Sequence, residues 1–128
     1  LWVIKNLQNN IPIKVVTDQI GNPTLVDDLA YAILKIIKGD RSGIYNICGA
    51  DRISRYDFAK KIASIFKLNQ LLIKPVLTSD FAQIAPRPLN SGLTCFKATS
   101  EMGIKFLGVE QGLYVLKKQI EIEGFINK

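Results

Sequence analysis

The sequence predicts an α/β fold in which short strands alternate with helices. Short runs rich in β-branched residues, such as Ile13–Val16, alternate with longer segments whose apolar residues recur at helical spacing. Turn residues and helix-capping patterns separate the two kinds of segment. The strands are too few for a complete doubly wound sheet, so the pattern indicates part of a larger α/β architecture.

Length and composition are those of one globular domain: 128 residues, 48% hydrophobic and 22% charged. The sequence contains no histidine, which excludes serine–histidine and cysteine–histidine catalysis within the chain and removes the commonest zinc ligand. The net charge of +6 is spread over several helix faces, so we expect a solvated basic surface and no nucleic-acid interface. Attraction of an anionic small ligand is the alternative.

Targeting and redox signals are sparse. No apolar run approaches the ~20 residues of a membrane span, and no signal-peptide pattern is present. Cys48 and Cys95 stand alone without CxxC spacing, which predicts buried thiols in a reducing compartment. We therefore expect a cytoplasmic protein that does not associate with membranes. The chain begins at Leu1, inside a predicted helix, so we expect it to be a fragment of a longer protein.

The N-terminal part predicts a helix, a strand and a turn. The helix covers residues 1–8 (LWVIKNLQ), and the strand covers Ile13–Val16. The turn DQIGNPT (residues 18–24) contains Gly21, which permits a left-handed backbone, and Asn22 before a proline, which favours extended geometry. This turn leads directly into the next helix.

A second helix is predicted from Thr24 to about Lys38. Thr24 and Asp27 match a capping box, and Gly39 ends the helix. The helix is apolar almost all round, which predicts that it is well buried. The next segment, Gly43–Gly49 (GIYNICG), predicts a compact strand.

The central part predicts a helix followed by a strand. Ser54 and Asp57 match a second capping box, which opens a helix to about Lys67. A third strand is predicted over Leu71–Val76, at a sheet edge or a strand end because it contains Pro75. One face of the helix carries three apolar residues, Phe58, Ile62 and Phe66.

The C-terminal part predicts a loop and two helices. A proline-rich polar loop covers Thr78–Gly92. Thr94 is expected to cap a short helix that Gly103 terminates. The last helix covers about Glu110–Glu123 and carries an apolar stripe.

Two turn-rich loops carry a family resemblance. VVTDQIGNPTLVDDLA (residues 15–30) and APRPLNSGL (residues 85–93), in this order, resemble the C-terminal half of the dTDP-4-dehydrorhamnose reductases. These are extended short-chain dehydrogenase/reductases of nucleotide-sugar synthesis. The resemblance implies that residues 1–128 are a single substrate-binding domain, the C-terminal lobe of such an enzyme, with the Rossmann half absent. A lobe without its partner is expected to expose apolar surface or to cover it by self-association, so a homo-oligomer is possible.

The same resemblance implies what the whole protein does. It would reduce the C4 ketone of a dTDP-linked deoxysugar with NAD(P)H, in dTDP-L-rhamnose biosynthesis, and its partner would be this nucleotide-diphosphate sugar. The cofactor site would lie outside this chain. Two alternatives stay open: a non-catalytic relative such as the regulatory subunit of methionine adenosyltransferase, and another nucleotide-sugar epimerase or reductase.

The APRPLNSGL loop is the first expected substrate-binding segment. Arg87 lies between two prolines, so its backbone is stiff, and a guanidinium can bind a diphosphate through two parallel N–H···O bonds. The matching arginine in related nucleotide-sugar enzymes contacts the substrate's phosphates. Asn90 and Ser91 add short hydrogen-bonding side chains to the same loop. The alternative role for Arg87 is an ion pair with a neighbouring carboxylate.

The DQIGNPT turn is the second expected substrate-binding segment. Its geometry can hold Gln19, Asn22 and Thr24 at one rim, where the following helix starts. The alternative is a turn and helix cap that bind no ligand.

Two matches to the catalytic pattern of the reductase superfamily occur out of context. In that pattern, Tyr-x-x-x-Lys, the lysine lies one helical turn from the tyrosine and lowers the pKa of its phenol. Tyr31–Lys35 and Tyr114–Lys118 fit the spacing, but neither follows a nucleotide-binding βαβ unit. The glycine-rich dinucleotide fingerprint is missing as well. We therefore predict no catalytic, cofactor-binding or metal-binding residue within this chain.

Overall fold

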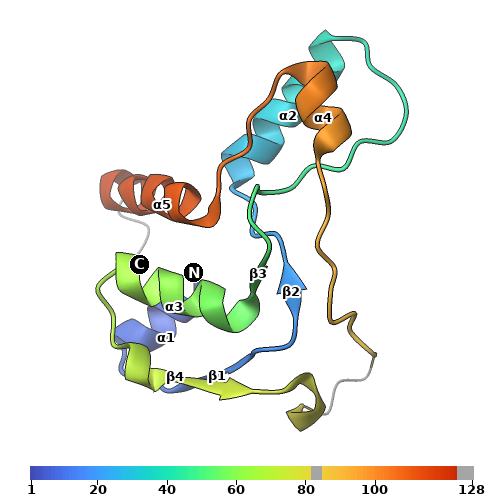
Figure 1. The fold of residues 1–128 in the computed structure, drawn as a ribbon. Coiled ribbons are helices and arrows are strands. Elements are labelled where there is room, and N and C mark those ends of the chain that lie inside the picture. Colours follow the sequence, from blue (N-terminus) through green and yellow to red (C-terminus); the bar gives the residue numbers. More distant parts are fainter. Residues whose placement is uncertain (82–84, 124–128) are drawn as a thin grey trace.

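The computed structural model describes residues 1–81 and 85–123, and it confirms an α/β fold of short strands and helices. Helices α1 and α3 pack against a small sheet and α5 packs on α3, while α2 and α4 lie together at the opposite end of the molecule (Figure 1). No helix in the described part of the chain is long and apolar enough to cross a membrane. In chain order the elements are α1 (Trp2–Gln8), β1 (Ile13–Val16), β2 (Ile20–Gly21), α2 (Val26–Lys38), β3 (Ile53–Ser54), α3 (Arg55–Ile65), the 3-10 turn η1 (Gln70–Leu72), β4 (Ile73–Val76), the 3-10 turn η2 (Thr78–Asp80), α4 (Phe96–Met102) and α5 (Val109–Glu123).

The sheet confirms the predicted first and third strands. Strands β1 and β4 pair in parallel, with Ile13 opposite Ile73 and Val16 opposite Val76. Pro75 lies within β4, and its missing N–H is tolerated because this sheet has two strands and β4 is an edge.

Helix α3 is the centre of the larger core. The Ser54 side chain accepts a hydrogen bond from the backbone N–H of Asp57 at 3.0 Å, which confirms Ser54 as the N-cap. The other half of the predicted capping box is not formed, because the Asp57 carboxylate accepts from the Ser54 hydroxyl instead of the backbone N–H. The helix ends at Ile65, earlier than predicted, because Lys67 adopts a left-handed φ of 55°. Helix α3 packs against α1, α5 and both strands of the sheet. Its buried side chains are Ala59, Ile62, Ala63 and Ile65.

Helix α2 departs from two expectations. It was predicted to be well buried, but Ala32 is its one buried residue, and Ile37 is 69% exposed. The reason is that α4 and the segment after it cover a single side of α2, through Ala98 and Phe106. The expected Thr24 cap is also wrong: Leu25 occupies the N-cap position, because the Thr24 hydroxyl binds Gly49 instead. The exposed apolar surface expected of a lobe without its partner is present on α2.

Two further local predictions are wrong. Residues 43–49 form no strand, because no strand edge lies beside them within residues 1–81 and 85–123; the short β3 pairs antiparallel with β2 instead. Thr94 does not cap α4, because the helix begins at Phe96 and Cys95 takes the N-cap position. Gly103 ends this helix in the left-handed conformation, with a φ of 63°, as predicted.

Candidate functional site

The two loops singled out in the sequence lie side by side. The N–H of Ile20 donates to the carbonyl of Leu89 at 2.7 Å, and the N–H of Ser91 donates to the carbonyl of Ile20 at 2.9 Å. On its other side, β2 pairs with β3, so the chain around Ile20 is held between two segments. This backbone pairing brings residues 85–93 and the DQIGNPT turn to one place.

Asn22 fixes this arrangement through both ends of its amide. Its Nδ2 donates to the carbonyl of Gly49 at 2.9 Å, and its Oδ1 accepts from the N–H of Leu93 at 2.9 Å. The hydroxyl of Thr24 accepts from the N–H of Gly49 at 3.0 Å. A Cβ at Gly49 would lie 2.0 Å from the carbonyl oxygen of Pro23, so only glycine allows the two segments to approach this closely. Asn22 and Thr24 therefore hold the loops together.

Gln19 and the preceding aspartate are tied to the end of β4. Gln19 is 6% exposed, and its Nε2 donates to the hydroxyl of Thr78 at 3.0 Å. Asp18 accepts hydrogen bonds from the hydroxyl and the N–H of Thr78, at 2.7 and 3.0 Å. The hydroxyl hydrogen bond is the main cause that lowers the pKa of Asp18 below its ordinary value.

A cavity of about 590 Å³ opens where these segments meet. We call it the arginine cavity, because Arg55 and Arg87 are among the residues that line it, and no lysine, aspartate or glutamate is among its described lining residues. Its lining residues are Gln19, Ile20, Gly21, Asn22, Pro23, Thr24, Ile47, Cys48, Ile53, Ser54, Arg55, Phe58, Arg87, Pro88, Ser91 and Leu93. Apolar side chains and polar loop groups thus surround a space with two positive charges, a combination suited to an anionic ligand with an apolar part.

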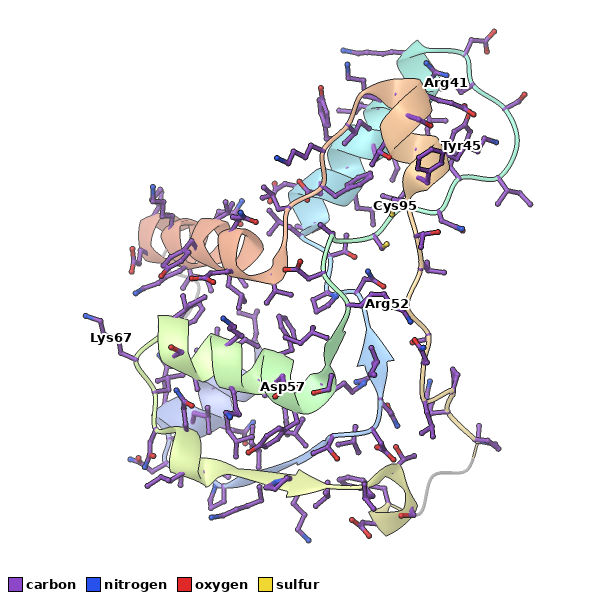
Figure 2. All side chains as sticks on the ribbon, viewed as in Figure 1. Arg41, Tyr45, Arg52, Asp57, Lys67 and Cys95 are labelled. Atoms are coloured by element: carbon purple, nitrogen blue, oxygen red, sulfur yellow. The ribbon has the colours of Figure 1, made fainter. Side chains whose placement is uncertain are left out.

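The structure brings five of the six expected site residues to the arginine cavity, namely Gln19, Asn22, Thr24, Arg87 and Ser91. The sixth, Asn90, does not line it. Its Oδ1 accepts a hydrogen bond at 2.5 Å from Arg52, which extends from β3's side of the molecule towards the segment that leads to α4 (Figure 2).

Sequence reasoning missed Arg55. The available signal was a cation directly after the Ser54 cap, in the first turn of a helix, where the helix dipole disfavours positive charge.

The two Tyr-x-x-x-Lys matches lie away from the arginine cavity. Tyr31 and Tyr114 are 51% and 52% exposed, and neither lines it. Tyr31 and Lys35 border a second hollow, of about 500 Å³, on the surface of α2. The Lys35 Nζ lies 5.5 Å from the centroid of the Tyr31 ring, a cation–π contact.

The far end of the molecule is held by interactions around α4. Arg41 donates to the carbonyl of Glu101 at 2.6 Å and lies 3.7 Å from its carboxylate. The Tyr45 hydroxyl donates to that carboxylate at 2.6 Å, and this bond raises the pKa of Tyr45. Figure 2 shows both side chains beside α4. Arg41 is therefore engaged with the protein itself.

Both cysteines are free thiols, and the predicted burial is confirmed for Cys48 but not for Cys95. Cys48 is buried and lines the arginine cavity, whereas Cys95 is half-buried, and their sulfurs lie 2.9 Å apart. Desolvation, together with the neighbouring Cys95, raises the pKa of Cys48 to about 12. Within residues 1–81 and 85–123, no group of three or more histidine, cysteine or acidic side chains is placed to hold a metal ion.

Comparison with known proteins points to one family. A family model described as the RmlD substrate binding domain matches residues 2–121. A dTDP-4-dehydrorhamnose reductase of Aggregatibacter actinomycetemcomitans is 33% identical over 114 residues, which cover 80% of this chain and 39% of that protein.

Solved structures agree with this sequence similarity. The crystal structure of a dTDP-4-dehydrorhamnose reductase from Clostridium acetobutylicum matches with a TM-score of 0.86 and 27% identity, over 94% of this chain and 42% of that one. The reductase from Bacillus anthracis, solved in complex with NADP, matches with a TM-score of 0.82 and 30% identity, over 92% of this chain and 42% of that one. The chain therefore spans less than half the length of the relatives that it matches.

Proposed function

The chain belongs to the RmlD substrate binding domain family, and we propose that it is the single substrate-binding domain of a longer NAD(P)H-dependent reductase. The substrate of the whole protein would be a dTDP-linked 4-keto deoxysugar, and its pathway would be dTDP-L-rhamnose synthesis in the cytoplasm. The free thiols of Cys48 and Cys95 fit a reducing compartment.

The observation that carries this proposal is the charge of the arginine cavity. Arg55 and Arg87 line it without a carboxylate among the described lining residues. The ion pairs in the described part of the chain are Arg41–Glu101 and Lys61–Glu110, and neither involves Arg87. A guanidinium binds phosphate oxygens through parallel hydrogen bonds, and a nucleoside diphosphate supplies both the charge and the oxygens.

The apolar lining of the cavity suits the rest of such a ligand. Ile53, in β3, and Phe58, in the first half of α3, line the cavity together with Arg55. An aromatic ring offers a flat surface on which a base or a sugar can pack. The chain's own role in the reaction is then to bind the diphosphate and to orient the sugar.

The cofactor would supply the hydride, and its binding residues would lie in the remaining part of the protein. The sequence of this chain has no glycine-rich dinucleotide fingerprint, and neither of its Tyr-x-x-x-Lys matches lines the arginine cavity. We therefore assign no hydride or proton transfer to residues of this chain.

The reductase is favoured over a regulatory relative because the similar proteins described above are dTDP-4-dehydrorhamnose reductases. The test is to mix the whole protein with NADPH or NADH and dTDP-4-dehydrorhamnose, and to follow oxidation of the cofactor. We expect oxidation that depends on the sugar nucleotide, and none from the 128-residue chain alone. Tight binding of the sugar nucleotide without turnover would favour the regulatory protein, and turnover by the chain alone would contradict the assignment of catalysis to the rest of the protein.

A further inference from the structure

We infer that Arg55 is a second diphosphate-binding residue, which closes on the ligand from the side opposite to the 85–93 loop and acts together with Arg87. The inference rests on the proposed function and adds to it a residue that the loop motifs do not contain. It makes the arginine cavity selective for two linked phosphate groups over one.

The backbone of Arg55 is fixed from both sides. Its N–H donates to the carbonyl of Gln19 at 3.0 Å, which ties the start of α3 to the DQIGNPT turn. Ser54 caps the same turn of helix through the N–H of Asp57 at 3.0 Å. Because the main chain is held at this point, Arg55 lines the cavity from a rigid base.

Arg55 has no ion-pair partner among residues 1–81 and 85–123. Its position in the first turn of α3 sets a cation at the positive end of the helix dipole. The adjacent carboxylate, that of Asp57, is engaged by the Ser54 hydroxyl at 2.7 Å, and no ion pair of Arg55 occurs within the described residues. An arginine at this locally unfavourable position, on the lining of a cavity, is better explained by a bound anion than by its contribution to the fold.

Arg55 and Arg87 reach the cavity from different segments. Arg55 comes from α3, and Arg87 comes from the loop that the Ile20 backbone hydrogen bonds hold in place. Each guanidinium can bind the oxygens of one phosphate group in a fork-like geometry. A diphosphate then engages both residues at once, whereas a monophosphate engages one of them.

Because a diphosphate should engage both arginines and a monophosphate only one, titrations with the two kinds of ligand test the inference. The whole protein is titrated calorimetrically with dTDP and with dTMP, as wild type and as the Arg55→Gln, Arg87→Gln and Lys60→Gln variants. Lys60→Gln is the matched control, because it removes one charge from the same helix at an exposed side chain that does not line the cavity. We expect Arg55→Gln to weaken dTDP binding by about 10-fold and dTMP binding by less than about 3-fold, so that the preference for the diphosphate shrinks. Arg55→Lys should restore part of the loss.

The outcomes separate this inference from the proposed function. No binding of dTDP to the wild type would overturn both. The wild type could bind dTDP and Arg87→Gln could weaken this binding, while Arg55→Gln behaves like Lys60→Gln. In that case the role inferred for Arg55 is wrong, but the proposed substrate-binding function is retained. An equal loss of affinity for dTDP and for dTMP would also overturn the inference, because Arg55 would then not contact the second phosphate group. If Arg55→Gln does not fold, the Arg55→Lys variant is tested instead, since it keeps the positive charge. An unchanged preference for dTDP over dTMP in Arg55→Lys would contradict the fork-like contact of the guanidinium.

Discussion

The side chain of Asn22 accepts a hydrogen bond from the backbone N–H of Leu93 at 2.9 Å, although the two residues are 71 positions apart in the sequence. The other end of the same amide donates to the carbonyl of Gly49. One side chain thus joins the DQIGNPT turn to both of the segments that complete the arginine cavity. This explains why a residue expected to bind substrate is engaged with the protein itself.

Asn22→Ala should therefore destabilise the fold. The change leaves the part-buried carbonyl of Gly49 and the exposed N–H of Leu93 without their partners, which costs about 1–3 kcal/mol in the free energy of unfolding, mostly at Gly49. Urea denaturation of both proteins measures the difference. Asn6→Ala is the control, because Asn6 makes one exposed hydrogen bond within α1, and its loss should change stability by less than about 0.5 kcal/mol. Equal effects of the two substitutions would show that Asn22 does not hold the loops.

The tyrosines of the two Tyr-x-x-x-Lys matches should be dispensable for catalysis. In the whole protein, Tyr31→Phe and Tyr114→Phe should leave kcat within about 2-fold of the wild type, because both side chains are exposed and neither lines the arginine cavity. Steady-state kinetics at saturating sugar nucleotide measure this. A drop of ~10³ in kcat with the fold intact would identify a catalytic tyrosine in this chain.

Cys48 should resist alkylation at neutral pH. Because its pKa is raised to about 12, the thiol is protonated at pH 8, and the reactive thiolate is a minute fraction of the population. Iodoacetamide labelling followed by peptide mass spectrometry should show slow modification of Cys48 in the native protein, accelerating steeply as the pH rises towards 12. Labelling in urea is the control, where the rate should become that of an ordinary cysteine. Rapid native labelling at pH 8 would contradict the burial and the raised pKa.

The 128-residue chain by itself should self-associate through α2. This helix exposes Ile33, Leu34 and Ile37. Two copies of the chain can bury this apolar surface by packing their α2 helices against each other. Sedimentation velocity should show an oligomer that the double substitution Ile33→Gln/Ile37→Gln shifts towards the monomer. Leu71→Gln, which removes a single exposed apolar side chain on η1, should leave the oligomer unchanged. A compact wild-type monomer with a sharp thermal transition at high temperature would contradict this prediction.

The sequence predicted the features that local interactions determine. The Ser54 cap joins residues three positions apart, and the end of α4 at Gly103 depends on the conformation of that residue alone. The strands β1 and β4 were recognisable from their composition, although their parallel pairing was not. Local patterns also located the loops that contain Arg87 and Asn22.

The predictions that were wrong depend on contacts between residues that are far apart in the sequence. The burial of α2 and a strand over residues 43–49 both require neighbouring segments, and the described residues provide too few of them. Thr24 was expected to cap a helix, but Gly49 competes for its hydroxyl from 25 positions away. Asn90 was expected to bind substrate, but its Oδ1 accepts a hydrogen bond from Arg52, which lies 38 positions away in the sequence. No short-range pattern reports such contacts.

The most direct test of this account is calorimetric titration of dTDP into the whole protein and its Arg87→Ala variant. A charge-assisted contact of one guanidinium with a phosphate group contributes roughly 1.5–3 kcal/mol, so Arg87→Ala should weaken binding by about 10- to 100-fold. In kinetics the loss should appear mainly in KM, since the diphosphate is remote from the reacting C4, and Arg87→Lys should recover part of it. Unchanged affinity for dTDP in a folded Arg87→Ala variant would contradict the account and would make Arg87 a structural residue of its loop.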